Sequence, residues 1–130
     1  MGETIIEKII RHNTGKAVKP GDIVTVNVDR VMIHDIFIPF VADKFEEMGF
    51  TKLHDPDKVV LIYDHLVPAS QQDDTRHFRT GDAFAEKYGL THVHRSDGIC
   101  HQLMTEAGYV KPGDIAFGTD SHTTTYGCVG

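Results

Sequence analysis

The hydrophobic positions of this 130-residue sequence change their spacing several times along the chain. The isoleucines of residues 5–10 recur at helical spacing, and Thr4 and Glu7 have the pattern of a capping box at the start of a helix. We therefore predict a short amphipathic helix that ends near Gly15 and docks its isoleucine face on the rest of the domain.

Residues 19–22, Lys-Pro-Gly-Asp, are typical of a turn, and the alternating valines that follow predict a strand over residues 23–33. Pro39 fits the first position of a second helix, because the apolar residues of 40–48 keep helical spacing and Gly49 fits its end.

The continuous apolar run of residues 59–63 predicts a buried parallel strand. Residues 72–88 predict a helix closed by Gly89, although Gly81 in its interior is unfavourable, and residues 91–94 predict a brief strand.

The segment Lys111-Pro112-Gly113-Asp114 repeats the pattern of residues 19–22 and precedes apolar residues 115–117. The flanking sequences differ, so we interpret the pair as a recurring turn into a strand and not as a true repeat. Alternating strand and helix patterns together predict an α/β domain with a mostly parallel sheet flanked by helices.

Polar groups follow the predicted strands, where ligands of parallel sheets gather, so we expect these groups to converge. They are His34, Asp64-His65, Cys100-His101 and Asp120-Ser121-His122. An adjacent carboxylate suits an imidazole for proton transfer near neutral pH.

Each of these groups also has a structural interpretation. Asp64 and Asp35 are suited to cap a turn or a helix, and neighbouring side chains on an extended backbone point apart, so Asp64 can serve a histidine other than His65. Residues 120–125 can form a hydrogen-bonded turn, and Cys100 is more typical of a buried, unreactive thiol than of a nucleophile.

Composition narrows the function classes. The net charge of −6, without clustered Lys or Arg, disfavours nucleic-acid binding, and no apolar run approaches membrane-spanning length. Two cysteines outside any CxxC pair argue against a disulfide scaffold or a self-contained metal site, whereas nine histidines favour proton-transfer or metal chemistry. Without a secretory signal pattern, a cytoplasmic location is the expectation.

Four blocks, in order and spacing, resemble the aconitase superfamily, in particular large subunits of the 3-isopropylmalate dehydratase and homoaconitase type. They are residues 57–68, from Asp-Lys-Val-Val to Asp-His-Leu-Val-Pro; 98–102, Gly-Ile-Cys-His-Gln; 111–114; and 118–127, from Gly-Thr-Asp-Ser-His to Tyr-Gly. The resemblance implies a hydro-lyase that reversibly dehydrates and rehydrates (isomerises) 2-hydroxy di- or tricarboxylates such as 3-isopropylmalate. It also implies a [4Fe-4S] cluster whose open iron is a Lewis acid, and a separate small subunit. Homoaconitase, aconitase and dimethylmalate dehydratase are alternative activities.

The resemblance also implies residue roles. His65 is matched to the acid that protonates the departing hydroxyl, Asp64 to its charged neighbour, and His34 to a polar residue that contacts substrate.

In the later blocks, His101 and His122 are matched to histidines that hydrogen-bond the water or hydroxyl on the iron. Asp120 is matched to the partner of a histidine, and Ser121 to a contact of a substrate carboxylate.

Two features depart from the family pattern. Bulky residues 36–40, Ile-Phe-Ile-Pro-Phe, stand where small and hydroxyl residues are usual, which leaves the substrate open. The family's cluster cysteines, serine base and substrate arginines would lie beyond residue 130. Residues 1–130 are therefore expected to be a truncated N-terminal part of the catalytic domain, inactive and cluster-free alone.

Two other functions remain open from the residues alone. His65, His101, Asp120 and His122 also suit a metal hydrolase that binds zinc or iron. A non-catalytic regulatory module would need basic patches or a conspicuous apolar interface, and the acidic balance of the chain disfavours it.

Overall fold

The computed structural model describes residues 2–130, and its centre is a four-stranded sheet in which every pair of neighbours is parallel. The strands lie in the order β3-β2-β1-β4. Their bounds are Arg30–His34 for β1, Val59–Ile62 for β2, His92–His94 for β3 and Ala116–Gly118 for β4. The prediction of an α/β domain with a parallel sheet is confirmed.

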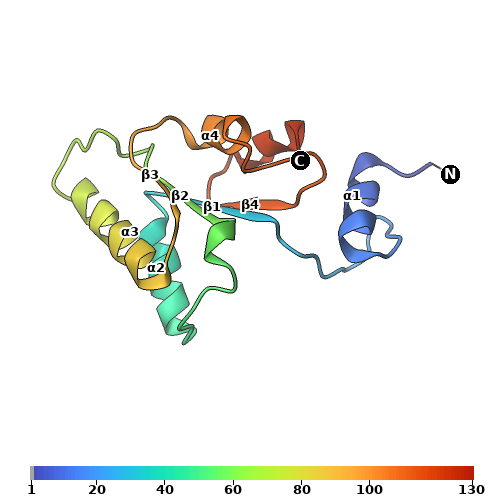
Figure 1. The fold of residues 1–130 in the computed structure, drawn as a ribbon, viewed down its shortest axis with the longest axis horizontal. Coiled ribbons are helices and arrows are strands. Elements are labelled where there is room, and N and C mark those ends of the chain that lie inside the picture. The colour runs from blue at the N-terminus through green and yellow to red at the C-terminus, as the bar shows by residue number, and fades with distance from the viewer. Residues whose placement is uncertain (1) are drawn as a thin grey trace.

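Helices cover both faces of the sheet (Figure 1). On one face lie α2 (Ile38–Glu47) and α3 (Asp74–Tyr88), and on the other lie α4 (Cys100–Glu106) and the 3-10 helix η2 (Thr123–Cys128). A short 3-10 helix, η1 (Pro56–Lys58), precedes β2. The spacing of apolar residues had predicted α2 and α3 to within a few residues, but it had not predicted α4.

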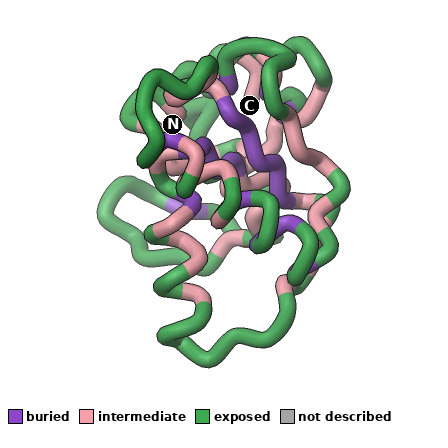
Figure 2. Tube along the Cα trace, turned by 90° about the vertical axis from the view of Figure 1, so that its left-hand side faces the viewer, coloured by how far each residue is buried: buried purple, intermediate pink, exposed green. Residues whose placement is uncertain are grey.

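Two separate cores form because successive strand residues face opposite sides of the sheet. Leu61 packs with Phe84 and Tyr88 beneath α2 and α3, whereas Val60 packs with Met104 beneath α4. All four residues of β2 are buried, in agreement with its purely apolar sequence, and the buried trace runs through the middle of the molecule (Figure 2). Each large apolar side chain fully buried contributes about 1.5–3 kcal/mol.

The strand order creates a switch point beside β1. The chain proceeds from β1 through α2 to β2 and through α3 to β3, and then returns by α4, on the opposite face, to β4 on the other side of β1. At such a reversal the two connections diverge and leave a crevice at the carboxyl ends of the strands. Residues that follow β1, β2 and β4 therefore meet at one edge.

The first helix, α1 (Ile5–Thr14), begins and ends as predicted. Thr4 and Glu7 complete a capping box, and Gly15 closes the helix with φ of 72°. However, no residue of α1 is buried, and Ile5 and Ile6 are 70% and 65% exposed. The expectation that its isoleucine face docks on the domain was wrong for this structure.

The strand predicted over residues 23–33 was also only partly right, because β1 comprises Arg30–His34 alone. Residues 23–28 have no strand partner among the described residues, and Ile23 is fully exposed. Alternating valines indicate which residues share a face, but a strand also needs a neighbour to receive its backbone hydrogen bonds. Here the backbone of Asn27 instead bonds the side chain of Asn13.

The repeated Lys-Pro-Gly-Asp segments do form the same turn. In each, the lysine N–H donates to the aspartate Oδ2 at 2.8 Å, for Lys19 with Asp22 and for Lys111 with Asp114. Only the second turn leads directly into a strand, β4.

No helix in the described part of the chain is long and apolar enough to cross a membrane.

Gly81 has a packing reason to interrupt α3. A Cβ atom at this position would lie 2.3 Å from the hydroxyl oxygen of Tyr63. That ring is buried and is fixed by hydrogen bonds from its hydroxyl to Asp82 and to the carbonyl of Phe78. The helix therefore accepts the entropic cost of glycine so that the end of β2 can approach it closely.

We predict that Gly81→Ala lowers the free energy of unfolding by about 1–3 kcal/mol, although alanine is the better helix former by about 1 kcal/mol. Urea unfolding measures the change. The double variant with Tyr63→Phe, which lacks the clashing oxygen, should recover part of the loss; equal losses in both backgrounds would contradict this explanation.

Candidate functional site

The polar groups predicted from the sequence meet at the switch point, at the carboxyl ends of β1, β2 and β4. Hydrogen bonds, close ion pairs or ring contacts connect His34, Asp64, His65, His101, Asp120, Ser121 and His122. The predicted convergence is confirmed, whereas the chemical role of each residue stays a prediction.

Asp64 binds its neighbour in sequence. Its Oδ1 lies 2.7 Å from Nδ1 of His65, and its Oδ2 accepts the backbone N–H of Cys100 at 2.7 Å. The alternative that Asp64 serves a different histidine is wrong, because β2 has ended at Ile62 and the backbone here is no longer an extended strand. Asp64 thus joins the end of β2 to the start of α4.

Asp120 is the centre of the cluster. Its Oδ1 lies 2.7 Å from Nε2 of His101 and accepts the backbone N–H of His122 at 2.8 Å, while its Oδ2 lies 3.4 Å from Nε2 of His65. Burial alone would raise the pKa of Asp120, but these hydrogen bonds and the histidine charges lower it to about 2. The carboxylate therefore stays ionised.

The tight turn after β4 determines where Asp120 lies. A Cβ atom on Gly118 would approach Oγ1 of Thr123 to 2.4 Å, so the turn requires glycine at this position. The Thr123 hydroxyl donates to the carbonyl of Asp120 at 2.7 Å, and Thr119 accepts the N–H of His34 through its hydroxyl. The loop after β4 is thereby fixed to β1.

His65 is a partly exposed imidazole among carboxylates. Partial burial alone would lower the pKa of His65, but the hydrogen bond that its ring donates to Asp64 and the charges of Asp64, Asp35 and Asp120 outweigh it, so the pKa is raised. The His65 side chain is 30% exposed, and its ring stacks on the ring of His34 with 4.2 Å between the ring centroids. The environment of His65 therefore favours the protonated imidazole, and the ring is accessible from outside.

Asp35 is the residue that sequence reasoning undervalued. It was expected at most to cap α2, but Phe37 is the N-cap residue and makes no side-chain cap bond. The fully buried carboxylate of Asp35 instead accepts the backbone N–H groups of His65 at 3.3 Å and Leu66 at 2.8 Å. These partners follow a different strand, so local sequence gave no signal beyond an aspartate at a strand end.

Burial alone would raise the pKa of Asp35, but the neighbouring His34 ring and the two backbone amides lower it on balance. The carboxylate lies 3.8 Å from Nδ1 of His65 and so favours the protonated imidazole. Asp35 both orients the loop that carries His65 and contributes to its charge.

His34 lies deeper than a substrate contact would require. It is 2% exposed, and neither ring nitrogen has a hydrogen-bond partner within residues 2–130. Nδ1 of His101 is likewise buried without a partner in the described chain. Unpaired buried nitrogens of this kind are costly, and a role in a functional site is one explanation for them.

Ser121 and His122 form the outer rim of the cluster. The Ser121 hydroxyl lies 3.1 Å from Nδ1 of His122, and the His122 side chain is 79% exposed. Both are accessible to a carboxylated ligand in solution.

Cys100, in contrast, is fully buried, and burial followed by the neighbouring Asp64 carboxylate raises the pKa of its thiol to about 12. The prediction of an unreactive thiol agrees with this environment.

Two groups bring potential metal-ligand atoms within 4.8 Å of one another: His34, Asp35 and His65, and His101, Asp120 and His122. In the first, two imidazoles are stacked face to face, a poor arrangement for ligands that bind through in-plane lone pairs. In the second, Asp120 already bonds His101 and the backbone of His122. We therefore interpret neither group as an ion site: the first is a stacked pair of rings beside a carboxylate, and the second is a hydrogen-bonded network.

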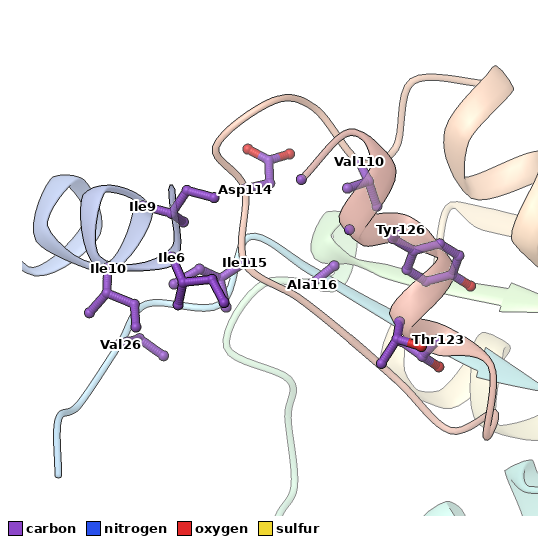
Figure 3. Close-up of a pocket in the computed structure, with 13 residues that line it drawn as sticks. Ile6, Ile9, Ile10, Val26, Val110, Asp114, Ile115, Ala116, Thr123 and Tyr126 are labelled. Carbon is purple, nitrogen blue, oxygen red and sulfur yellow. The ribbon is translucent and has the colours of Figure 1, made fainter. Parts of the chain in front are cut away.

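An open groove of about 470 Å³ lies away from this cluster, between α1 and the sheet (Figure 3). Isoleucines of α1 face it on one side, and Ile115, Ala116 and Tyr126 line the other. Its lining is almost entirely apolar and lacks the histidines of the switch point, so it does not form part of the candidate site.

Comparison with known families matches residues 5–130 to the family described as "Aconitase family (aconitate hydratase)". Three curated relatives are named 3-isopropylmalate dehydratase large subunit: those of Methanopyrus kandleri (large subunit 1), Sulfurihydrogenibium sp. and Moorella thermoacetica. They are 40%, 40% and 42% identical and match the whole chain. The chain spans only 31–32% of the length of these relatives.

We predict that Asp35→Asn lowers the pKa of His65, because the substitution removes one of the charges that favour the imidazolium. It should also lower the free energy of unfolding by about 1–3 kcal/mol, since buried amides lose their carboxylate acceptor. NMR titration of the histidine rings and urea unfolding measure the two effects. Asp97→Asn, at an exposed carboxylate that contacts His94, is the control and should leave His65 unchanged. An unaltered His65 pKa in Asp35→Asn would contradict the role given to Asp35.

Proposed function

Since this chain belongs to the aconitase family, we propose that it forms the N-terminal part of a hydro-lyase large subunit. The reaction we propose is the reversible dehydration of a 2-hydroxy dicarboxylate of the 3-isopropylmalate type. The observation that carries the proposal is the network centred on Asp120, which connects three histidines at the switch point of the sheet.

Dehydration of a 2-hydroxy acid requires a proton for the departing hydroxyl and the removal of a proton from the adjacent carbon. We assign the first task to His65, because the surrounding carboxylates raise its pKa and so favour the protonated imidazole, and because the ring is partly exposed. After the proton leaves, the neighbouring carboxylates favour its return, which suits a reversible reaction. No group within the described cluster is assigned to the second task.

The other residues of the cluster bind and orient. His101 is held by the ionised Asp120, so that its ring has one fixed orientation in the site. His122 and Ser121 lie at the rim, where an imidazole and a hydroxyl can donate to a substrate carboxylate.

An aconitase-type [4Fe-4S] cluster needs cysteine thiolates, and the thiols of this chain do not fit that role. Cys100 is buried with a strongly raised thiol pKa, while Cys128 lies alone and exposed on η2. We therefore place the cluster ligands, as well as the partner small subunit, outside these 130 residues. A cluster bound there would supply a Lewis acid, and this chain would supply the acid and the hydrogen-bonding groups.

We predict that the isolated chain binds no iron-sulfur cluster, because two separated thiols cannot replace the cysteine ligands such a cluster needs. Anaerobic reconstitution followed by iron and sulfide analysis tests this. Stoichiometric uptake by the monomer would show that the cluster ligands have been assigned wrongly.

For a complete large subunit carrying this sequence, we predict that His65→Ala lowers kcat by about 10²–10⁴-fold, the usual contribution of a positioned general acid. Ser121→Ala should mainly raise KM, because a hydroxyl on a substrate carboxylate acts equally in the ground and transition states. Steady-state kinetics, with cluster content measured in each variant, separates the two effects.

His54→Ala is the control for histidine removal, since His54 lies outside the cluster and should keep normal kinetics. A His65→Ala enzyme with full cluster content and near-normal kcat would falsify the assignment of His65.

A further inference from the structure

The apolar groove beside α1 lies on the face of the sheet that α4 and η2 cover (Figure 3). Isoleucines of α1 form one wall, and Val110, Ala116 and Tyr126 line the other. Ile6, at the groove, is 65% exposed. Exposed apolar surface gathered in one place is typical of sites that contact another protein segment.

Two polar side chains of the groove already have partners. The Asp114 carboxylate accepts the backbone N–H of Lys111 at 2.8 Å, and the Thr123 hydroxyl donates to the carbonyl of Asp120 at 2.7 Å. A charged or strongly polar ligand would lose water here and gain little in return. The groove therefore favours an apolar occupant.

The topology of the sheet indicates which segment reaches the groove. Connections between parallel strands are right-handed in about 98% of cases, so the direction of travel along the sheet decides which face a connecting helix covers. From β1 to β3 the chain uses α2 and α3 on one face, and its return to β4 uses α4 on the other. A further step in that direction, past β4, would again place its helix on the α4 face, where the groove lies.

Residues 129 and 130 are fixed at the wall of this groove. The Gly130 N–H donates to the carbonyl of Tyr126 at 2.8 Å, and Val129 packs against the core beneath α4. A Cβ atom on Gly130 would lie 2.9 Å from Cγ1 of Val110, so the backbone here follows the wall closely. A residue joined to Gly130 therefore starts at the groove.

We propose that the segment directly after Gly130 in the complete large subunit forms a helix that fills this groove and packs against the isoleucines of α1. This occupancy rests on the proposed function, in which residues 1–130 are the N-terminal part of a longer subunit. The relatives, of which the chain spans 31–32%, are long enough to supply such a segment. In the complete subunit, α1 docks on the sheet through this helix.

Tethering favours this segment over a separate chain. Residues joined to Gly130 stay close to the groove at a high effective concentration, whereas a second copy or a small subunit has to reach it by diffusion. Filling the groove also removes apolar area of Ile9 and Ile115 from water, worth about 25 cal/mol for each Å².

The test uses a complete large subunit that carries this sequence, assembled with its small subunit. The photo-reactive residue p-benzoylphenylalanine replaces Ile9, which lines the groove, or Ile5, which is 70% exposed on the same helix and lies outside the groove. After irradiation, mass spectrometry identifies the linked residues. The probe at position 9 should link to the segment directly after Gly130 of the same chain, and the probe at position 5 should give little of that product.

A second measurement avoids the bulky probe. Hydrogen exchange of the α1 amides is followed in the unaltered subunit and in the variants Ile9→Ser and Ile5→Ser. Ile9→Ser should speed this exchange by about tenfold or more, because α1 loses apolar contact with the helix that covers it. Ile5→Ser, the matched control, should leave the exchange nearly unchanged, and equal exchange in the two variants would count against the docked helix.

Other products of the crosslinking would overturn the proposal. With a mixture of isotope-labelled and unlabelled subunits, a mixed-label product would assign the groove to a second copy. A link to the small subunit would assign it to that partner, and a link to Ala116 or Tyr126 alone would show that α1 closes directly on the sheet. Absence of any link would show that the groove stays open.

Turnover of 2-hydroxy acids by the unaltered assembly separates this proposal from the proposed function. An active enzyme whose position 9 gives no link to the segment after Gly130 would refute the docked helix alone. The expected link in a protein that dehydrates no 2-hydroxy acid would refute the hydro-lyase reaction and keep the assignment of the groove.

Discussion

The pairing of β1 with β2 on one side and β4 on the other is the constraint on which the site depends. Because the three strands are parallel, their carboxyl ends lie at one edge, and groups as far apart in sequence as the His34 N–H and the Thr119 hydroxyl, 85 residues away, come within hydrogen-bond distance there. Both faces of the sheet must be covered to bury these strands, and α2 and α3 do this opposite α4 and η2. The loops that carry Asp64 and Asp120 are consequently held by the core and not by the ligand.

Local sequence predicted those parts of the structure whose causes are local. The apolar run of β2, the capping box of α1 and the glycine at the end of α3 depend on neighbouring residues, and all were recognised. The strand assigned to residues 23–28 failed because a strand depends on a distant partner. Asp35 was undervalued for the same reason, since the amides it binds lie 30 and 31 residues away.

The net negative charge of the cluster also indicates which groups the rest of the enzyme must supply. Asp35, Asp64 and Asp120 bring negative charge to one small region, and the histidines around them compensate it in part. No Lys or Arg belongs to the cluster of described residues, so a dicarboxylate would meet more repulsion than attraction. Cations supplied from another part of the assembled enzyme would have to balance the substrate, which makes this edge one half of a binding site.

The loose attachment of α1 has a consequence for how the molecule unfolds. A helix of ten residues is marginal by itself, and α1 buries no residue that would couple it to the sheet. Its backbone amides should therefore exchange with solvent through local opening, at a free-energy cost well below that of global unfolding. The chain is thus a cooperative parallel sheet joined to a separate, weakly coupled folding unit at its N-terminal end.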